Sequence, residues 1–224
     1  MNKKDPDFVV TFLTLRQTIG WVGLAMPFAV RLGALAFEHI RTTDSISAYY
    51  YTGMRDVFVG TLILVGVLLT CYRTPAKRDT IFAIIAGIAA TGIGLFPMEP
   101  TFAKEILARF PEMAQEKCYI NRGFLGYHFI FVTVFFALSF YLVYFRFDAF
   151  TPTNPTTQKL MRNKIYKVCG AVMFLAFSTI GVLAAVNQGG SIFWPETFAV
   201  LAFGIAWLVK GQTILKDADV AMAA

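Results

Sequence analysis

The chain has 224 residues, of which 57% are hydrophobic, 16% are aromatic and only 15% are charged. About a quarter of the residues in a soluble domain are charged, so this composition excludes an ordinary soluble protein and predicts an integral membrane protein. The net charge of +6 would also suit a nucleic-acid-binding protein. Basic residues that flank membrane spans and set their orientation explain the charge better, so we expect no nucleic-acid partner.

Long apolar runs predict an all-α membrane protein. A spanning helix needs about 20 residues, so the chain has room for about six spans in one domain that covers residues 1–224. The predicted spans are Ile19–Phe37, Asp56–Tyr72, Thr80–Met98, Gly123–Phe145, Val168–Val186 and Ile192–Val209. The first apolar run starts late and has no small-residue cleavage pattern, so we expect no cleavable signal peptide.

Three segments have patterns that predict further local structure: one before the first span, one within the third span and one between the third and fourth spans. Residues 5–13 are expected to form a surface helix before the first span. The third span carries Ala86, Ala90 and Gly94 at four-residue spacing, which predicts close contact with another helix. Residues 99–122 contain FAKEILARF, whose apolar residues recur at helical spacing, and this pattern predicts a short interfacial helix.

The basic residues predict the orientation of the six-helix bundle. If the N-terminus is cytoplasmic, the outer side has seven of the 20 lysines and arginines, and the cytoplasmic side has the other 13. The outer seven are Arg31, Arg41, Arg55, Lys104, Arg109, Lys117 and Arg122. Because lysine and arginine concentrate on the cytoplasmic side of membrane proteins, both termini are expected to be cytoplasmic.

The stretch DSISAYYYTGMRD (Asp44–Asp56) is unusually rich in hydroxyls and charges for so apolar a chain. In the predicted topology it lies on the outer face, where the outer ends of the spans also carry polar residues. The cytoplasmic halves of the spans have no comparable residues. We therefore interpret the asymmetry as a polar pocket that opens outward, with this stretch as its lid or rim.

Arg31 is the most informative residue of this polar group. It lies about 9 Å below Phe37 at 1.5 Å per residue, and a charge within the hydrocarbon needs a partner or a wet cavity. Glu38 is on the same helical face, and Asp56 or Glu196 could approach from neighbouring helices. Alternatively, Arg31 snorkels or pairs with Asp56 only to hold the helices together, and the tyrosines form an interfacial belt.

The first functional hypothesis is recognition of a lipid headgroup or a small polar ligand, because aromatic rings and arginine donors suit a phosphate or carboxylate. The predicted ligand-binding residues are Arg31, Ser47, Tyr50, Tyr51, Arg55, Asp56, Arg122, His128, Trp194 and Glu196. Membrane lipids are the expected partners, with a homo-oligomer or an unidentified membrane protein as a further partner.

The second hypothesis is an enzyme that acts on an outer-leaflet lipid, with His128, Asp56 and Glu38 as candidate catalytic residues. Ser45 or Ser47 could complete a Ser-His-Asp arrangement with His128 and Asp56, although no nucleophile elbow is present. A metal-dependent hydrolase would have only His39 and His128 as weak candidate ligands, and no HxxxH motif. Haem between the two histidines would need both rings buried, so no cofactor is predicted. The third hypothesis is a structural or assembly subunit without a site.

The segments SISAYYYTGMRDVFVG, RNKIYKVCG and FAVLAFGIAWLVKG resemble a group of uncharacterised bacterial six-span inner-membrane proteins. They lie in the first outer connection with the second span, at the start of the fifth span, and in the sixth. The resemblance implies the six-span fold and the bacterial inner membrane. It implies no activity and no catalytic residues.

Overall fold

A computed structural model describes residues 6–98, 106, 108, 126–186 and 191–216, and all regular elements in these residues are helical. In chain order they are α1 (Pro6–Glu38), the 3-10 helix η1 (Ile46–Tyr51), α2 (Arg55–Cys71), α3 (Lys77–Leu95), α5 (Tyr127–Tyr141), the π-helical turn η4 (Leu142–Arg146), α6 (Thr157–Ala185) and α7 (Phe193–Lys210).

Five of these helical segments are long and apolar enough to cross a membrane, which makes the chain a multi-pass membrane protein. They are Thr11–Glu38, Lys77–Leu95, Tyr127–Arg146, Thr157–Leu183 and Phe193–Lys210. Large apolar side chains also cover the outside of the bundle, including Trp21, Leu32, Val67, Ile88, Val168 and Leu175. So much exposed apolar surface is typical of a protein whose solvent is lipid.

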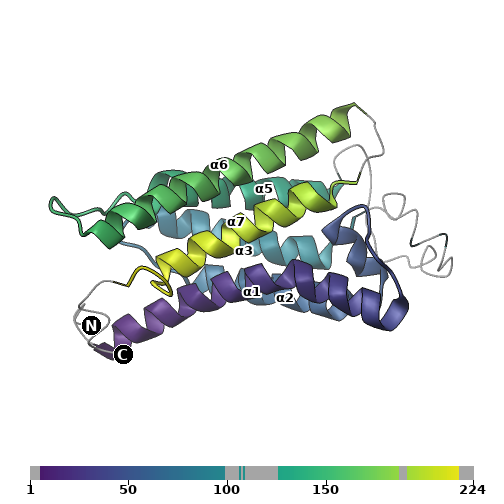
Figure 1. The fold of residues 1–224 in the computed structure, drawn as a ribbon, viewed down its shortest axis with the longest axis horizontal. Coiled ribbons are helices and arrows are strands. Elements are labelled where there is room, and N and C mark those ends of the chain that lie inside the picture. Colours follow the sequence, from purple (N-terminus) through teal and green to yellow (C-terminus); the bar gives the residue numbers. More distant parts are fainter. Residues whose placement is uncertain (1–5, 99–105, 107, 109–125, 187–190, 217–224) are drawn as a thin grey trace.

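The six long helices form a ring in the order α1, α2, α3, α5, α6 and α7, and α7 packs back against α1 (Figure 1). The segment η1 lies at one end of the ring against α1, α2 and α7. We call this the η1 end. The start of α1 and the end of α7 lie at the opposite end, which we call the termini end (Figure 1).

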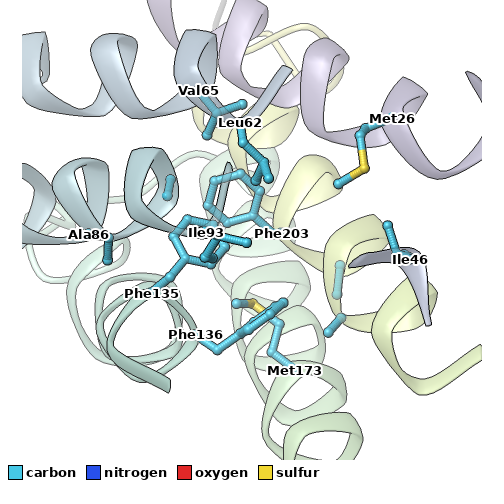
Figure 2. Close-up of a cluster of buried hydrophobic side chains, with 14 of the residues drawn as sticks. Met26, Ile46, Leu62, Val65, Ala86, Ile93, Phe135, Phe136, Met173 and Phe203 are labelled. Carbon is cyan, nitrogen blue, oxygen red and sulfur yellow. The ribbon is translucent and has the colours of Figure 1, made fainter. Parts of the chain in front are cut away.

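Apolar side chains from every helix fill the middle of the ring. Figure 2 shows Ile93 of α3, Phe135 of α5 and Phe203 of α7 converging beneath Leu62 and Val65 of α2. The rings of Phe135 and Phe203 lie 5.4 Å apart, within the range in which aromatic rings attract one another. These contacts hold the helices around a largely apolar interior.

Helices α2 and α3 approach most closely at a pair of glycines. A Cβ atom on Gly66 would lie 2.7 Å from the Gly87 carbonyl oxygen, and one on Gly87 would lie 2.5 Å from that of Gly66. Only glycine permits this backbone contact. Ala86, Ala90 and Gly94 are buried as well, which confirms the prediction that this side of α3 takes a close helix contact.

The helix positions agree with the predicted spans to within a few residues, except at two helix starts: α1 begins at Pro6 rather than Ile19, and α6 begins at Thr157 rather than Val168. The separate surface helix expected over residues 5–13 is wrong, because α1 continues unbroken from Pro6 to Glu38. Phe12 stacks on Tyr72 at 5.6 Å and Leu13 is buried, so this part of α1 packs on the bundle. The predicted interfacial helix over residues 99–122 lies almost entirely outside the described residues.

Candidate functional site

The segment η1 is a buried plug rather than a wet loop. All six of its residues, Ile46–Tyr51, are buried. Ser45 caps its start in an extended conformation, and its hydroxyl accepts from the Ser47 N–H at 3.1 Å. At the other end the Thr52 N–H donates to the Tyr49 carbonyl at 3.1 Å. A polar backbone that enters an apolar bundle needs such partners, because no water supplies them.

Glu196 anchors the start of η1 from the first turn of α7. Its carboxylate accepts from the Ser45 hydroxyl at 2.9 and 2.8 Å, and from the Ile46 N–H at 2.5 Å. The Ile192 N–H, just before α7, donates to the Asp44 carbonyl at 2.7 Å. The serine-rich connection is thus tied to the sixth long helix through buried hydrogen bonds.

His128, in the first turn of α5, reaches η1 from the opposite side. Its Nδ1 lies 2.8 Å from the Phe96 carbonyl oxygen, and its Nε2 lies 3.0 Å from the Ser47 hydroxyl. A carbonyl oxygen can only accept, so this network assigns the proton to Nδ1 and leaves the Nε2 lone pair to accept from Ser47. The imidazole is 5% exposed.

A cavity of about 60 Å³ lies directly below η1, in the middle of the ring. Ser47 and Glu196 are the polar residues at its η1 end, and Thr61 adds a second hydroxyl to its lining. The rest of the wall is apolar and includes Met26, Phe58, Phe135 and Phe203. The cavity therefore offers one polar end and a long apolar wall.

The tyrosine run makes contacts with its immediate surroundings. The Arg55 guanidinium donates to the Tyr50 hydroxyl at 2.7 Å and lies 4.2 Å from the centre of its ring. The Tyr51 hydroxyl donates to the Met98 carbonyl at 2.5 Å. Tyr49 is fully buried edge-on to Phe193, and burial raises the pKa of its hydroxyl above the usual value. None of the three rings is part of the cavity wall.

Arg31 lies outside the cavity wall as well. Its guanidinium donates to the Arg41 carbonyl at 3.3 Å and lies 5.2 Å from the Trp194 ring centre. Asp56 is exposed, and the described residues contain no ion pair between it and Arg31. Glu38 instead accepts from the Gly53 N–H. The pairing of Arg31 with these carboxylates, which the sequence suggested, is therefore not formed.

The two histidines do not form a shared metal or haem site. His39 is exposed at the end of α1, with φ of 57°, whereas both ring nitrogens of His128 have protein partners. In the part of the chain that the structure describes, no three His, Cys, Asp or Glu side chains are grouped as metal ligands. Arg122, also predicted to bind a ligand, lies outside the described residues.

Of the predicted site residues, the structure brings Ser47, His128 and Glu196 together. Sequence reasoning gave Ser45 no ligand-binding role and missed the Phe96 carbonyl, which directs His128. The available signal for the first was the serine itself, since serine is favoured at the start of a helical turn, where its hydroxyl accepts from a backbone N–H. No signal for a backbone carbonyl exists in a single sequence.

The expectation that the cytoplasmic halves of the spans lack buried charge is wrong. At the termini end, Asp79 of α3 is 2% exposed and accepts from Arg146 at 2.8 Å. The ammonium group of Lys210, the last residue of α7, donates to the Phe147 carbonyl at 2.7 Å. Asp79, Arg146 and Lys210 each lie one position outside a predicted span, so the hydropathy pattern did not place them inside the bundle.

In comparisons with known proteins, no family model, no curated protein and no solved structure matches this chain. The resemblance to six-span bacterial proteins therefore stays a prediction, and the argument for function depends on the geometry alone.

Replacing Glu196 with Met is expected to lower the free energy of unfolding by about 1–3 kcal/mol, because the buried Ser45 hydroxyl and Ile46 N–H lose their acceptor. The matched change Glu38→Met removes one hydrogen bond at the edge of the bundle, and should cost less than about 1 kcal/mol. Unfolding of the purified protein in mixed micelles, followed by tryptophan fluorescence, measures both. Equal stability of the Glu196→Met variant and the unchanged protein would contradict the anchoring role.

Proposed function

We propose that the protein is a six-span protein of the bacterial cytoplasmic membrane with both termini in the cytoplasm. The sixth span would be α2, whose 17 residues, mostly apolar after Arg55 and Asp56, are at the lower limit of about 17 for a spanning helix. An even number of spans agrees with the position of the start of α1 and the end of α7 at one end. The excess of lysine and arginine in the connections at that end supports its cytoplasmic orientation.

Two single cysteines in a background without Cys71, Cys118 and Cys169 test this orientation. Thr42→Cys lies at the η1 end and Lys77→Cys at the termini end, and both positions are exposed. A membrane-impermeant maleimide added outside spheroplasts is expected to label position 42, and to label position 77 only after the membrane is opened. The reverse pattern would overturn the proposed orientation.

The proposed ligand is the part of a membrane lipid where an acyl chain joins its polar group. The observation that carries this proposal is the position of Ser47 and Glu196 together at one end of an otherwise mostly apolar cavity. A lipid hydroxyl would donate to the Ser47 oxygen, because the Ser47 proton is already donated to His128 Nε2. The methylenes beside it would contact Phe58, Phe135 and Phe203. Because aromatic side chains line the cavity and Arg31 does not, a neutral group fits it better than a phosphate.

The size of the cavity limits how much of the lipid enters. An engineered cavity of roughly 150 Å³ holds a benzene-sized molecule, and the cavity here measures about 60 Å³. It therefore has room for a few methylenes or atoms of similar size. The remainder of the lipid would stay in the bilayer beside the bundle.

A lipid with a diazirine on the methylene next to its ester group tests this placement. In nanodiscs, photolysis is expected to crosslink it to residues of the cavity wall. Val65→Phe, which fills the cavity from a side chain that is 4% exposed, should reduce that crosslinking at least roughly fivefold. Val67→Phe, on the outside of the same helix at 52% exposure, is the matched control and should change nothing.

The positions of the crosslinks in the unchanged protein show whether the lipid enters the cavity, even where Val65→Phe destabilises the bundle. A second filling variant, Val132→Phe on α5, provides an independent check because Val132 also lines the cavity. Crosslinks confined to outward-facing residues such as Val67 would overturn the proposal.

A second candidate function, acyl transfer or ester hydrolysis, is favoured by the 3.0 Å contact between Ser47 and His128 Nε2. Ser47 would attack the ester carbonyl while His128 takes its proton, and the alcohol would leave with that proton to give an acyl-serine. Water would then release the acid and restore Ser47. The Phe96 carbonyl accepts from the imidazole at the position that an aspartate occupies in a catalytic triad. The predicted catalytic carboxylates do not occupy that position, because Asp56 is exposed and Glu38 accepts from the Gly53 N–H.

A long-chain alkyl fluorophosphonate is the probe for this second candidate. If Ser47 is an activated nucleophile, its oxygen displaces fluoride and mass spectrometry finds the adduct on Ser47. His128→Gln should slow labelling by a factor of about 10²–10⁴, because it removes the base. Ser191→Ala, at an exposed serine near α7, should leave labelling unchanged. If the folded protein passes the lipid crosslinking test but forms no adduct on Ser47, the enzymatic candidate is rejected and lipid binding is the function that stands.

A further inference from the structure

A second cavity, of about 40 Å³, lies at the termini end of the bundle, far from η1. Its lining includes three basic side chains, Arg16 of α1, Arg146 of η4 and Lys210 of α7, and a single carboxylate, Asp79 of α3. Four elements that are distant in sequence thus bring an excess of positive charge to one small space. This cluster plays no part in the function proposed above.

The carboxylate is already neutralised by one of the three cations. Both oxygens of Asp79 accept from Arg146 Nε at 2.8 Å. Asp79 lies in the first turn of α3, where the helix dipole also favours a negative charge. The π-helical turn η4 directs Arg146 to this place, and π-helical turns are frequent at functional sites. The other nearby carboxylate, Asp148, pairs with Lys167 at 3.0 Å.

Lys210 is left without a negative partner. Its ammonium group donates to the Phe147 carbonyl at 2.7 Å and lies 4.9 Å from the centre of the Phe147 ring. No carboxylate among the described residues is within ion-pairing distance of it. An ammonium group has three donors, so the protein supplies a partner for only part of this group's capacity.

Arg16 likewise has unused donor capacity. Its Nη1 donates to the Lys210 carbonyl at 3.3 Å, and its guanidinium lies 4.0 Å from the Phe12 ring centre. Its Nε is buried without a hydrogen-bond partner in the described part of the chain. Burial raises the pKa of the neighbouring Tyr72 hydroxyl, and Arg16 opposes that rise. The hydroxyl therefore stays neutral and adds no negative charge.

Positive charge that is half-buried without compensation carries a desolvation cost, and an anion in the cavity would offset that cost. Arginine and lysine donors that converge on one space match the oxygens of a phosphate group. A cavity of 40 Å³ admits about one water-sized group. The phosphate would therefore insert one or two oxygens and lie at the mouth, beside the exposed rings of Pro75 and Phe150.

We propose that this cavity binds a phosphate group between Arg16, Arg146 and Lys210. Two sources have that chemistry: the headgroup of an anionic phospholipid, which lies at the depth of the bundle end, and soluble phosphate from the adjoining aqueous phase. The basic connections around the termini end would attract either one.

Thermal unfolding of the full-length protein in neutral detergent tests the proposal. The additions are sodium phosphate, sodium chloride at equal ionic strength, and micelles of phosphatidylglycerol or phosphatidylcholine. A higher Tm with phosphate than with chloride would identify soluble phosphate as sufficient. A rise with phosphatidylglycerol, but with neither phosphate nor phosphatidylcholine, would identify the lipid headgroup.

Lys210→Met removes a donor of the cavity and keeps the length of the side chain. This change is expected to weaken the binding of whichever ligand stabilises the unchanged protein by roughly tenfold or more, because a charge-assisted contact is lost. Lys77→Met, an exposed lysine at the same end, is the matched control and should behave like the unchanged protein. Lys210→Arg, which keeps the charge, should retain binding.

The proposal is overturned if neither phosphate nor phosphatidylglycerol stabilises the unchanged protein, or if Lys210→Met responds as strongly as Lys77→Met. Where Lys210→Met fails to fold, Arg16→Met replaces it, because that change leaves the Asp79–Arg146 pair intact. The titrations of the unchanged protein decide the outcome independently of both variants.

Discussion

The carboxylate of Glu196 is the constraint on which the η1 end depends. A chain that folds back into an apolar bundle brings N–H, C=O and hydroxyl groups with it, and each needs a partner inside the protein. Glu196 supplies an acceptor for both Ser45 and Ile46, and His128 supplies one for Ser47. With these bonds made, η1 can close the end of the ring. The space below it is then a cavity with one polar end.

The same constraint is met differently at the termini end. Asp79 and Arg146 satisfy and neutralise each other, as a buried pair must to avoid a large desolvation cost. Lys210 and Arg16 have backbone carbonyls as partners, which satisfy hydrogen bonds but carry no net charge. The η1 end is thus largely satisfied within the protein, whereas the termini end has an excess of positive charge. This difference is why we propose a neutral polar group for one cavity and a phosphate for the other.

The sequence predicts where the helices lie much better than which polar side chains meet. Apolar runs follow from the thickness of the bilayer, and they place α2, α3 and α7 to within a few residues. Side-chain partners depend on how each helix is rotated about its axis, which a single sequence of uniformly apolar spans does not encode. Arg31 was therefore expected at the centre of a pocket, yet it faces Trp194 and the Arg41 carbonyl. Ser47, His128 and Glu196 were in the predicted set, but nothing singled them out.

Two local structures account for most of the remaining differences. The 3-10 helix η1 turns Ser45 and Ser47 inward from what looked like a surface loop, since polar residues that cap a turn resemble those of an exposed connection. The π-helical turn η4 shifts the face of the helix that follows α5 and so brings Arg146 onto Asp79. A single inserted residue per turn leaves no trace in hydropathy. Buried charge at the termini end was therefore missed.

The two polar ends are separated by an interior of buried apolar side chains. Leu62 and Val65 of α2 and Phe203 of α7 belong to one cluster of buried apolar side chains in this interior (Figure 2). An ion or polar substrate that crossed from Ser47 to Lys210 would need polar partners along this path, as broken helices provide in transporters. The described helices continue through this region without such a break. The arrangement therefore favours two separate sites, one for each face of the membrane, over a single pathway between them.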